Sequence, residues 1–387
     1  MALTPTQMID FDGMLTDEER MMRSTVANFC DSELRPHIDQ WFEDHTIPRD
    51  LGPKFGNIGV LGMHLDGYDC AGTSAVAYGL ACLELEAVDS GVRSFVSVQG
   101  SLAMYAIHKW GSEDQKNHWL PKMAAGEAIG CFGLTEPDFG SNPGGMRTNA
   151  RRDGDGWVLN GSKMWITNGS LADVAVVWAR TDEGYAGFLV EKDTPGFTTN
   201  DIHRKMSLRA SITSELVLDN VRVSDDARLP KVTSLRGPLS CLNEARFGIM
   251  FGALGAARDC IEQTLAYVAE RQVFDKPLSS YQLTQAKLAD MVLELDKGLL
   301  LALQLGRLKD AGTLPVESIS LGKLNSTREA LNIARTCRTL LGASGITTEY
   351  SPIRHANNLE SVLTYEGTAE MHQLIIGNAL TGEAAFR

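Results

Sequence analysis

The sequence predicts an α+β protein of three parts, with helices at both ends of the chain and a mostly antiparallel β part between them. A helical pattern runs from about residue 14 to 130, short β-type runs occupy 131–235, and long helical stretches return from 237. A chain of 387 residues exceeds the usual size of a single hydrophobic core. We therefore expect three domains, at 1–130, 131–235 and 236–387.

The N-terminal part opens with the pattern of a capping box. Thr16 is the expected N-cap, and Glu19 follows three residues later. Further helices are expected at about 72–89, 97–110 and 113–125, separated by Gly and Pro. We find no internal repeat and no low-complexity segment.

The middle part is rich in strand-forming residues. The dipeptide Asn160-Gly161 lies between two short β-type runs, which is the strongest short-range signal for a hairpin. Further runs at 172–180, 185–193 and 214–223 are separated by Gly, Asp and Pro. These features predict a sheet of mostly antiparallel strands.

The C-terminal part begins with a helical stretch of more than thirty residues, which is long for a globular protein. Gly248, Gly252 and Gly255 recur along it at helical spacing, so one face should let a neighbour approach closely. Each Gly costs roughly 1 kcal/mol relative to Ala in a helix interior, and contacts on that face should offset this cost. Further helices would complete a bundle, at about 279–311, 315–341, 352–364 and 367–378.

The composition is ordinary for a globular protein and excludes several functions. Apolar residues make up 43% and charged residues 22% of the chain. The net charge of -13 argues against nucleic acid, which requires clustered Lys and Arg. The seven cysteines form no C-x-x-C pair, which indicates reduced thiols and no zinc site. Without a targeting pattern or an apolar run of ~20 residues, we expect a cytoplasmic protein with no membrane span and no metal centre.

One glutamate near the end of the chain has two interpretations. The Rossmann, P-loop, zinc-protease and α/β-hydrolase motifs are absent, which leaves Glu366 in the stretch TYEGT as a candidate. A lone Glu is most often a solvated side chain. The aromatic neighbour Tyr365 favours a raised carboxyl pKa, however, and Gly367 permits a turn that could set a base into a cleft. The residue alone does not decide between them.

Arg93 also leaves two interpretations open. It lies among Val and Phe residues, where an unpaired guanidinium would be costly. Glu86, Arg93 and Ser97 are spaced so that a single helix would place them on one stripe. Arg93 could form a structural ion pair with Glu86 or Asp89, or its planar fork could bind a carboxylate.

Three other segments can be read as structure or as ligand contacts. The loop 131–142 could be a turn-rich entry to the β part or a cradle for a ligand. Arg271 could favour the C-terminal dipole of the long helix or contact a phosphate. Trp165 and Thr167 could pack a strand or contact an aromatic cofactor.

An ordered set of segments resembles the acyl-CoA dehydrogenase family over about residues 14–385. The segments are CFGLTEPDFGS, LNGSKMWITN, ARFG, ERQVF, LLGASGI and TYEGT. Each is weak alone, but their order and spacing are specific. Within the family, KMSLRAS, GPLSCLNEARFGI, LQLGRLKD and IRHANNLE are similar to the branch that acts on glutaryl-CoA. The resemblance implies a helical N-terminal domain, a middle β-barrel-like domain and a C-terminal four-helix bundle, assembled as a homotetramer.

The resemblance also implies FAD, bound between the β domain and the C-terminal domain, with its ADP end reaching a neighbouring subunit. The residues that match flavin contacts are Phe132, Leu134, Thr135, Ser141, Trp165 and Thr167. Those that match pyrophosphate and adenosine contacts from the adjoining subunit are Arg271, Phe274, Gln282, Gly342 and Gly345. Thr368 and Glu370 would contact the dinucleotide, and Ser141, Asn243 and Arg246 would contact the acyl-CoA.

The base of this family is the Glu of the Y-E-G-T motif, which is Glu366 here. Some members carry it immediately before the Arg of the A-R-F-G motif instead, and that position is Ala245, which cannot act as a base. The resemblance implies that Glu366 takes the α-proton of an acyl-CoA thioester while the β-hydride passes to flavin N5. Electrons would then pass to electron-transferring flavoprotein.

The glutaryl-CoA branch holds the distal carboxylate of its substrate with an Arg and a Ser on an N-terminal helix. Arg93 and Ser97 match these residues, and Glu86 and Tyr365 are further matches. Loss of CO2 would follow dehydrogenation and give crotonyl-CoA.

Several departures from the family pattern keep alternatives open. Asn142 replaces a usual Asp, Thr339 and Ala343 change the adenosine side, and Val92 replaces a frequent Tyr beside the substrate Arg. One alternative is a straight- or branched-chain acyl-CoA dehydrogenase with a structural Arg93. Others are a glutaryl-CoA dehydrogenase that does not decarboxylate, and a helical scaffold without catalysis.

Overall fold

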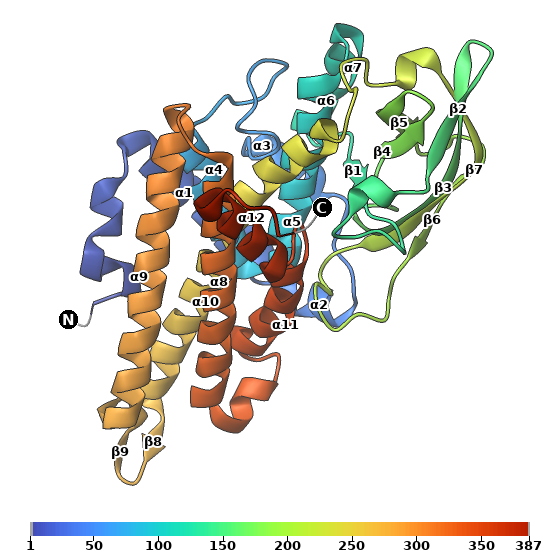
Figure 1. Cartoon of the computed structure of the whole chain (residues 1–387). Helices are drawn as coiled ribbons and strands as arrows, with labels where there is room; N and C mark the ends of the chain where they lie inside the picture. The colour runs from blue at the N-terminus through green and yellow to red at the C-terminus, as the bar shows by residue number, and fades with distance from the viewer. Residues whose placement is uncertain (1–2, 386–387) are drawn as a thin grey trace.

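The computed structural model describes residues 3–385 and confirms the order of helix, sheet and helix (Figure 1). The expected capping box is present, because the Thr16 hydroxyl accepts from the backbone N–H of Glu19 at 3.3 Å and the Glu19 carboxylate accepts from that of Thr16 at 2.8 Å. The N-terminal helices are α1 (Asp17–Phe29), α2 (Ile38–Glu43), α3 (Leu51–Asn57), α4 (Ala75–Val88), α5 (Ser90–Ser97), α6 (Tyr105–Trp110) and α7 (Glu113–Ala124).

The helix expected at 97–110 begins earlier, at Ser90, and includes a π-helical turn at Val98–Met104 between α5 and α6. Asp89 separates α4 from α5 and caps α5, accepting from the backbone N–H of Gly91 at 2.7 Å. The expectation of one helical stripe for Glu86 and Arg93 is therefore wrong, because they lie on two helices that meet at Asp89.

The middle part is one seven-stranded sheet in the order β1-β4-β2-β3-β7-β6, with β5 paired to β4. All neighbours are antiparallel except β1 with β4 and a single pair between β2 and β4. This confirms the predicted, mostly antiparallel β part. The strands are β1 (Gly130–Gly133), β2 (Asn149–Asp153), β3 (Gly156–Thr167), β4 (Val174–Thr181), β5 (Gly184–Glu191), β6 (Phe197–Asp201) and β7 (Thr213–Ser224).

The hairpin expected at Asn160-Gly161 is wrong. Strand β3 runs through this dipeptide, and its register against β7 shifts between Leu159 and Gly161, which marks a β-bulge. The turn between β2 and β3 lies instead at 154–155. The left-handed freedom of Gly161 (φ +146°) serves the bulge, not a turn.

The C-terminal part is a bundle around the expected long helix, α8, which spans 35 residues. A short hairpin between α8 and α9, which the sequence analysis did not predict, lies at the end of the bundle away from the sheet (Figure 1). The elements are α8 (Arg236–Glu270), β8 (Gln272–Val273), β9 (Lys276–Pro277), α9 (Gln282–Asp310), α10 (Val316–Leu340), α11 (Ser351–Thr364) and α12 (Ala369–Thr381).

The glycine stripe of α8 faces α4, so the close neighbour that its spacing predicted is a helix. A Cβ atom at Gly255 would lie 1.8 Å from the carbonyl oxygen of Leu83, and one at Gly248 would lie 2.6 Å from the Tyr78 hydroxyl. The buried side chains of α4 and α8 belong to one hydrophobic core that joins the N-terminal and C-terminal helices. This close packing holds the residues of α4 against the centre of the bundle.

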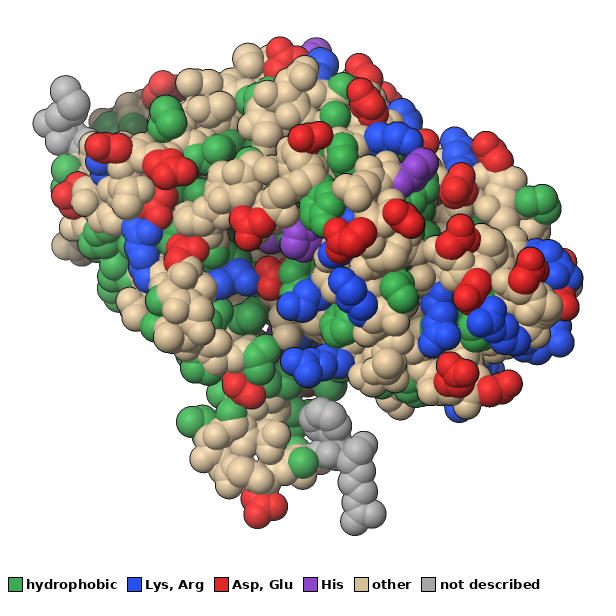
Figure 2. All heavy atoms as spheres, turned by 90° about the horizontal axis from the view of Figure 1, so that it is seen from above, with side chains coloured by type: hydrophobic (Ala, Val, Ile, Leu, Met, Phe, Trp, Pro, Cys, Tyr) green, Lys and Arg blue, Asp and Glu red, His purple; other side chains and the backbone are tan. Residues whose placement is uncertain are grey.

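The surface carries acidic and basic side chains interspersed over the face shown in Figure 2. All seven cysteines are free thiols, and all but Cys70 are buried. Within residues 3–385, no helix has both the length and the apolar character needed to cross a membrane.

Candidate active site

Glu366 lies in the short turn that connects α11 to α12, with its backbone in the left-handed region. Its φ is +53°, and that of Gly367 is +107°. A residue with a Cβ rarely adopts such a φ, and the strain persists only where the surroundings hold it. The turn follows directly from the end of α11, where the backbone N–H of Tyr365 donates to the carbonyl of Ser361 at 2.8 Å.

Two cationic side chains from other helices hold this turn. Arg246 of α8 donates through Nε to the carbonyl oxygen of Glu366 at 2.6 Å. Lys323 of α10 donates through Nζ to the carbonyl oxygens of Tyr365 at 2.5 Å and Gly367 at 2.7 Å. The backbone on both sides of Glu366 is therefore fixed, whereas its carboxylate Oε2 has no hydrogen-bond partner within residues 3–385.

The protein surroundings bring the pKa of Glu366 close to neutral pH. Burial raises the pKa of Glu366 to about 7, although the nearby charges of Arg93, Lys323 and Arg246 act in the opposite direction. Burial also lowers the pKa of the Lys323 ammonium. A carboxylate that is surrounded by cations, yet hydrogen-bonded to none of them through Oε2, is suited to accept a proton from a ligand.

Arg93 of α5 is buried and forms the structural ion pair that the sequence left open. Its Nε donates to Glu86 Oε2 at 2.6 Å, and its Nη2 donates to the hydroxyl of Tyr365. Burial opposes the charge of Arg93, but the Glu86 carboxylate raises its pKa well above the usual value. A Cβ at Gly252 of α8 would lie 2.1 Å from Glu86 Oε2, so the glycine stripe leaves room for this pair.

The same arginine keeps part of its fork free. Within residues 3–385, Nη1 of Arg93 donates no hydrogen bond, and the buried hydroxyl of Ser97 has no partner. The Ser94 hydroxyl lies 3.3 Å from that of Tyr365. Because buried polar groups are normally paired, the free Ser97 hydroxyl and the free Nη1 of Arg93, whose Nη2 meets Tyr365 beside Glu366, fit a polar ligand.

Two of the three residues predicted to contact the acyl-CoA, Asn243 and Arg246, lie together on α8. Asn243 Oδ1 accepts from Arg246 Nη1 at 3.1 Å, and Arg246 reaches the Glu366 carbonyl. Ala245 between them is fully buried, so the alternative base position holds no acid or base. Ser141, by contrast, lies exposed in the loop after β1.

The predicted flavin contacts of the β part gather where β1 ends and β3 ends. The backbone N–H of Met164 donates to the carbonyl of Thr135 at 2.9 Å and joins the two segments. Trp165 lies at a second bulge of β3 with φ +65° and 60% of its surface exposed. An exposed indole held in this way fits stacking on a flat ring system. Phe132 and Leu134 are buried on the neighbouring segment, and Thr167 is partly exposed at the end of β3.

The predicted dinucleotide contacts of the C-terminal part lie elsewhere. Phe274, at the tip of the β8–β9 hairpin, is 89% exposed, and Gln282 at the start of α9 is exposed as well. This hairpin is at the far end of the bundle from the sheet (Figure 1). One chain therefore does not bring these residues to Trp165, as expected for residues that serve an adjoining subunit.

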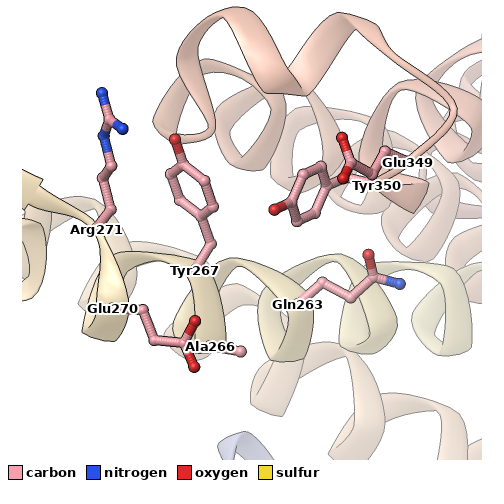
Figure 3. Close-up of a pocket in the computed structure, with 7 residues that line it drawn as sticks. All are labelled: Gln263, Ala266, Tyr267, Glu270, Arg271, Glu349 and Tyr350. Carbon is pink, nitrogen blue, oxygen red and sulfur yellow. The ribbon is translucent and has the colours of Figure 1, made fainter.

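Arg271, which ends α8, lies on a groove of about 440 Å³. Figure 3 shows Tyr267 of α8 next to Tyr350 in this groove, and their rings meet edge to face with centroids 5.6 Å apart. Gly342 lies exposed after α10 with φ +60°, and a Cβ at the buried Gly345 would lie 2.3 Å from a backbone carbonyl. Gly345 therefore has a packing role, whatever its contacts with a ligand.

The residues that follow Gly367 begin α12. The Thr368 hydroxyl caps this helix by accepting from the backbone N–H of Met371 at 3.3 Å. Hydrogen bonds at the helix start lower the pKa of the exposed Glu370. Both residues have structural roles at the start of this helix, and their contact with the dinucleotide remains a prediction.

Two buried residues of the site were missed by the sequence analysis, Lys323 and His372. Lys323 is fully buried, and the His372 ring would lie 3.0 Å from a Cβ at Gly367. The signal for Lys323 was present, because it shares a helical stripe with Ile319 and Ala330, which are buried.

Comparison with known proteins identifies the family. Three family models match in order: acyl-CoA dehydrogenase N-terminal domain at 16–127, middle domain at 131–221 and C-terminal domain at 236–381. The human mitochondrial short-chain specific acyl-CoA dehydrogenase is 34% identical over 373 residues, covering 95% of this chain and 90% of that protein.

Solved structures agree. A glutaryl-CoA dehydrogenase from Mycobacterium smegmatis in complex with FADH2 matches with a TM-score of 0.99 and 69% identity over 100% of both chains. Butyryl-CoA dehydrogenase from Megasphaera elsdenii matches with a TM-score of 0.90 and 30% identity, over 95% of this chain and 98% of that one. The chain belongs to the acyl-CoA dehydrogenase family, whose members are oxidoreductases that use FAD.

Proposed function

We propose that this acyl-CoA dehydrogenase oxidises glutaryl-CoA and decarboxylates the product to crotonyl-CoA and CO2. The observation that carries the proposal is the buried Arg93, which donates through Nη2 to Tyr365 next to Glu366 and through Nε to Glu86, while its Nη1 donates no hydrogen bond within residues 3–385. A guanidinium with a free terminal nitrogen suits a carboxylate at the far end of an acyl chain. The likeness to the M. smegmatis glutaryl-CoA dehydrogenase supports the same substrate.

In the proposed reaction Glu366 is the base. Its carboxylate takes the α-proton of the thioester, while Arg246 and Lys323 hold the peptide units around it. The backbone N–H of Glu366 has no acceptor within residues 3–385 and is free to donate to the thioester oxygen as negative charge develops there. FAD, when bound, supplies the acceptor for the hydride that leaves the β-carbon.

The proposed decarboxylation uses the same carboxyl group, Glu366. The bond between the γ-carbon and its carboxylate breaks, CO2 leaves, and the electron pair is delocalised into the unsaturated thioester. Protonated Glu366 then returns its proton to the resulting dienolate, which gives crotonyl-CoA. The site thus needs one group that both accepts and donates a proton, and a pKa of about 7 suits Glu366 to both tasks.

The remaining assignments are part of the proposal. The exposed Trp165 and the segments around it fit the flavin end of FAD, and Arg271 and Phe274 fit the dinucleotide end of an FAD bound to an adjoining subunit. We infer a cytoplasmic homotetramer that passes electrons to electron-transferring flavoprotein, with domain limits near 130 and 235.

The experiment compares turnover of glutaryl-CoA and butyryl-CoA by the flavin-loaded enzyme and by Arg93→Ala. Loss of a charged hydrogen bond should lower kcat/KM for glutaryl-CoA roughly 10- to 100-fold, and change it much less for butyryl-CoA. Arg258→Met is the control, because it removes another buried arginine, paired with Glu84. Equal losses on both substrates, or a preference for butyryl-CoA that Arg93→Ala leaves unchanged, would refute glutaryl specificity.

A second candidate is dehydrogenation of an acyl-CoA that has no distal carboxylate. The ion pair of Arg93 with Glu86 favours it, because that pair satisfies part of the guanidinium without a ligand. The remaining alternative is a glutaryl-CoA dehydrogenase that does not decarboxylate. The mass of the product tests it, since glutaconyl-CoA retains the carboxyl group that crotonyl-CoA has lost.

A further inference from the structure

Lys323 is a buried cation beside the proposed base that contacts the backbone around Glu366 and not its carboxylate. It lies on α10, which packs against α8, α11 and α12, and its side chain is fully buried. Burying an ammonium is costly unless its donors are satisfied. Its Nζ meets two carbonyl oxygens, those of Tyr365 and Gly367, at 2.5 and 2.7 Å.

These two carbonyls flank Glu366 on its two sides. Holding both of them restrains the peptide unit that leads into Glu366 and the one that follows Gly367, while Arg246 holds the unit between these two. Because Glu366 has a φ of +53°, which is unfavourable for a side chain with a Cβ, the turn needs such external support. Lys323 is therefore placed to maintain the strained backbone that aims the carboxylate.

The charge of Lys323 acts on the carboxylate without a hydrogen bond to it. Its positive charge favours ionised Glu366, as do the charges of Arg246 and Arg93. The groups that face Lys323 from the elements packed around it are Arg93 of α5, Arg246 of α8, Tyr365 and Glu366 of the turn, and His372 of α12.

Burial lowers the pKa of two cations of this group, Lys323 and Arg246. The arginines remain charged throughout the neutral range. Burial lowers the pKa of His372 to about 3, so its ring is neutral there, and burial raises the pKa of Tyr365 to about 12. The charge state around Glu366 near neutral pH therefore varies at Lys323 alone.

We propose that Lys323 is a positioning residue for the base, because its ammonium clamps the strained turn through two carbonyls and keeps the Glu366 carboxylate ionised. The proposal rests on the proposed function of Glu366. It assigns Lys323 no contact with substrate, so its loss should change the chemical step more than binding.

The sign of the electrostatic effect follows from the charges. Burial raises the pKa of Glu366, and the positive charge of Lys323 lowers it. Removing that charge should therefore raise the pKa of Glu366 further and reduce its ionised fraction at neutral pH. An opposite charge within a few Å typically shifts a carboxyl pKa by roughly 1–3 units. The pH midpoint of flavin reduction should therefore move to higher pH by about that amount. Arginine at the same position keeps the charge and should leave the midpoint near its original value.

The experiment mixes flavin-loaded enzyme with excess glutaryl-CoA without oxygen and follows bleaching of the flavin from acid to alkaline pH. Lys323→Gln keeps two N–H donors but removes the charge. Lys323→Met removes the donors as well as the charge, and Lys323→Arg keeps the charge. We expect bleaching at neutral pH to slow about tenfold or more in Lys323→Gln, with recovery at alkaline pH. The affinity for a CoA thioether analogue that cannot be oxidised should change little.

Arg258→Met is the matched control, because it removes a buried cation far from the turn and should lower the melting temperature without moving the midpoint. A Lys323→Gln enzyme with an unchanged midpoint would overturn the proposal and leave Lys323 a purely structural role. If Lys323→Gln retains too little flavin to be measured, Lys323→Arg becomes the test. Because arginine keeps the positive charge, a shifted midpoint in this variant would overturn the proposal. Normal bleaching in Glu366→Gln would refute the base itself, a failure distinct from that of Lys323.

Discussion

At the residue scale, the site depends on a single carboxylate that three cations surround and whose backbone two of them hold. Arg246 binds the carbonyl of Glu366 itself, and Lys323 binds the carbonyls on either side. Burial and the neighbouring charges then act on the pKa in opposite directions. The fixed backbone and the unpaired Oε2 together leave the proposed base held by its main chain and free at its side chain.

Glu366→Gln removes the proton acceptor while keeping nearly the same volume. The purified variant should bind FAD and remain yellow, but glutaryl-CoA should no longer bleach it. A visible spectrum before and after substrate addition measures this. Glu360→Gln, at an exposed glutamate of α11, is the control and should bleach normally. Bleaching of Glu366→Gln at a near-normal rate would assign the proton transfer to another group.

The pH dependence of flavin reduction follows from the raised pKa of Glu366. Only the ionised carboxylate accepts a proton, so the rate should rise as pH increases through about 7 and then level off. Rapid-mixing measurements over a pH series give the midpoint directly. A midpoint near 4, the ordinary range for Glu, would mean that the carboxylate is more solvated than the structure describes.

Resemblance to a family predicted Glu366, Arg93 and Arg246 from the sequence, but residue types alone did not. A lone Glu and a lone Arg each kept a structural interpretation, and Arg93 indeed forms its ion pair with Glu86. Lys323 was missed because a lysine in a helix normally reaches water. Only tertiary packing reveals that its partners are two carbonyls from a turn more than forty residues away.

At the scale of elements, the packing of α4 against α8 positions the Arg93 pair. Gly255 and Gly252 bring the two helices so close that the backbone of α4 and the Glu86 carboxylate occupy the space of the missing side chains. The glycine stripe, read from the sequence as a close-approach surface, was therefore a correct prediction.

Gly255→Ala should separate these helices. The added Cβ would lie 1.8 Å from the carbonyl oxygen of Leu83, which belongs to the backbone and cannot move aside alone. Overpacking of this kind typically costs about 1–3 kcal/mol of unfolding free energy. Gly377→Ala in α12 is the control, because it has open space around it and should gain up to about 1 kcal/mol from helix propensity. Urea unfolding of both variants tests the contrast, and equal stability of the two would contradict it.

Turns were predicted less well than helices, for a physical reason. The Asn160-Gly161 dipeptide permits the left-handed backbone of a two-residue turn, but the same freedom serves a β-bulge when the strand continues. A real hairpin turn occurs at Phe274 and Asp275, which have φ values of +48° and +68° and lack any glycine. Long periodic helices are fixed by their own sequence, whereas such turns are decided by the strands that flank them.

At the scale of the whole molecule, large apolar side chains are exposed on the C-terminal bundle. They come from several of its elements: Phe274, Leu283, Leu293, Leu300, Leu321, Ile346 and Leu380. We expect part of this apolar surface to be covered by neighbouring subunits, because apolar side chains that gather into a contiguous patch mark contact sites. The candidate dinucleotide contacts Phe274 and Gln282 lie in the same region, away from the sheet (Figure 1). An assembly that covers this surface would also bring the second set of FAD contacts to the first.

Assembly and flavin binding should therefore be lost together. We expect the wild-type protein to have a mass in solution of four times the 42.1 kDa of one chain. Leu283→Glu places a charge on the 81% exposed position at the start of α9, and burying that charge between subunits would be costly. Light scattering after gel filtration should show smaller species, and the visible spectrum should show less bound flavin. Met21→Glu on α1, where the side chain is 67% exposed, is the control and should change neither. Dissociation of Leu283→Glu with full retention of flavin would contradict FAD binding between subunits, because each chain would then hold its cofactor alone.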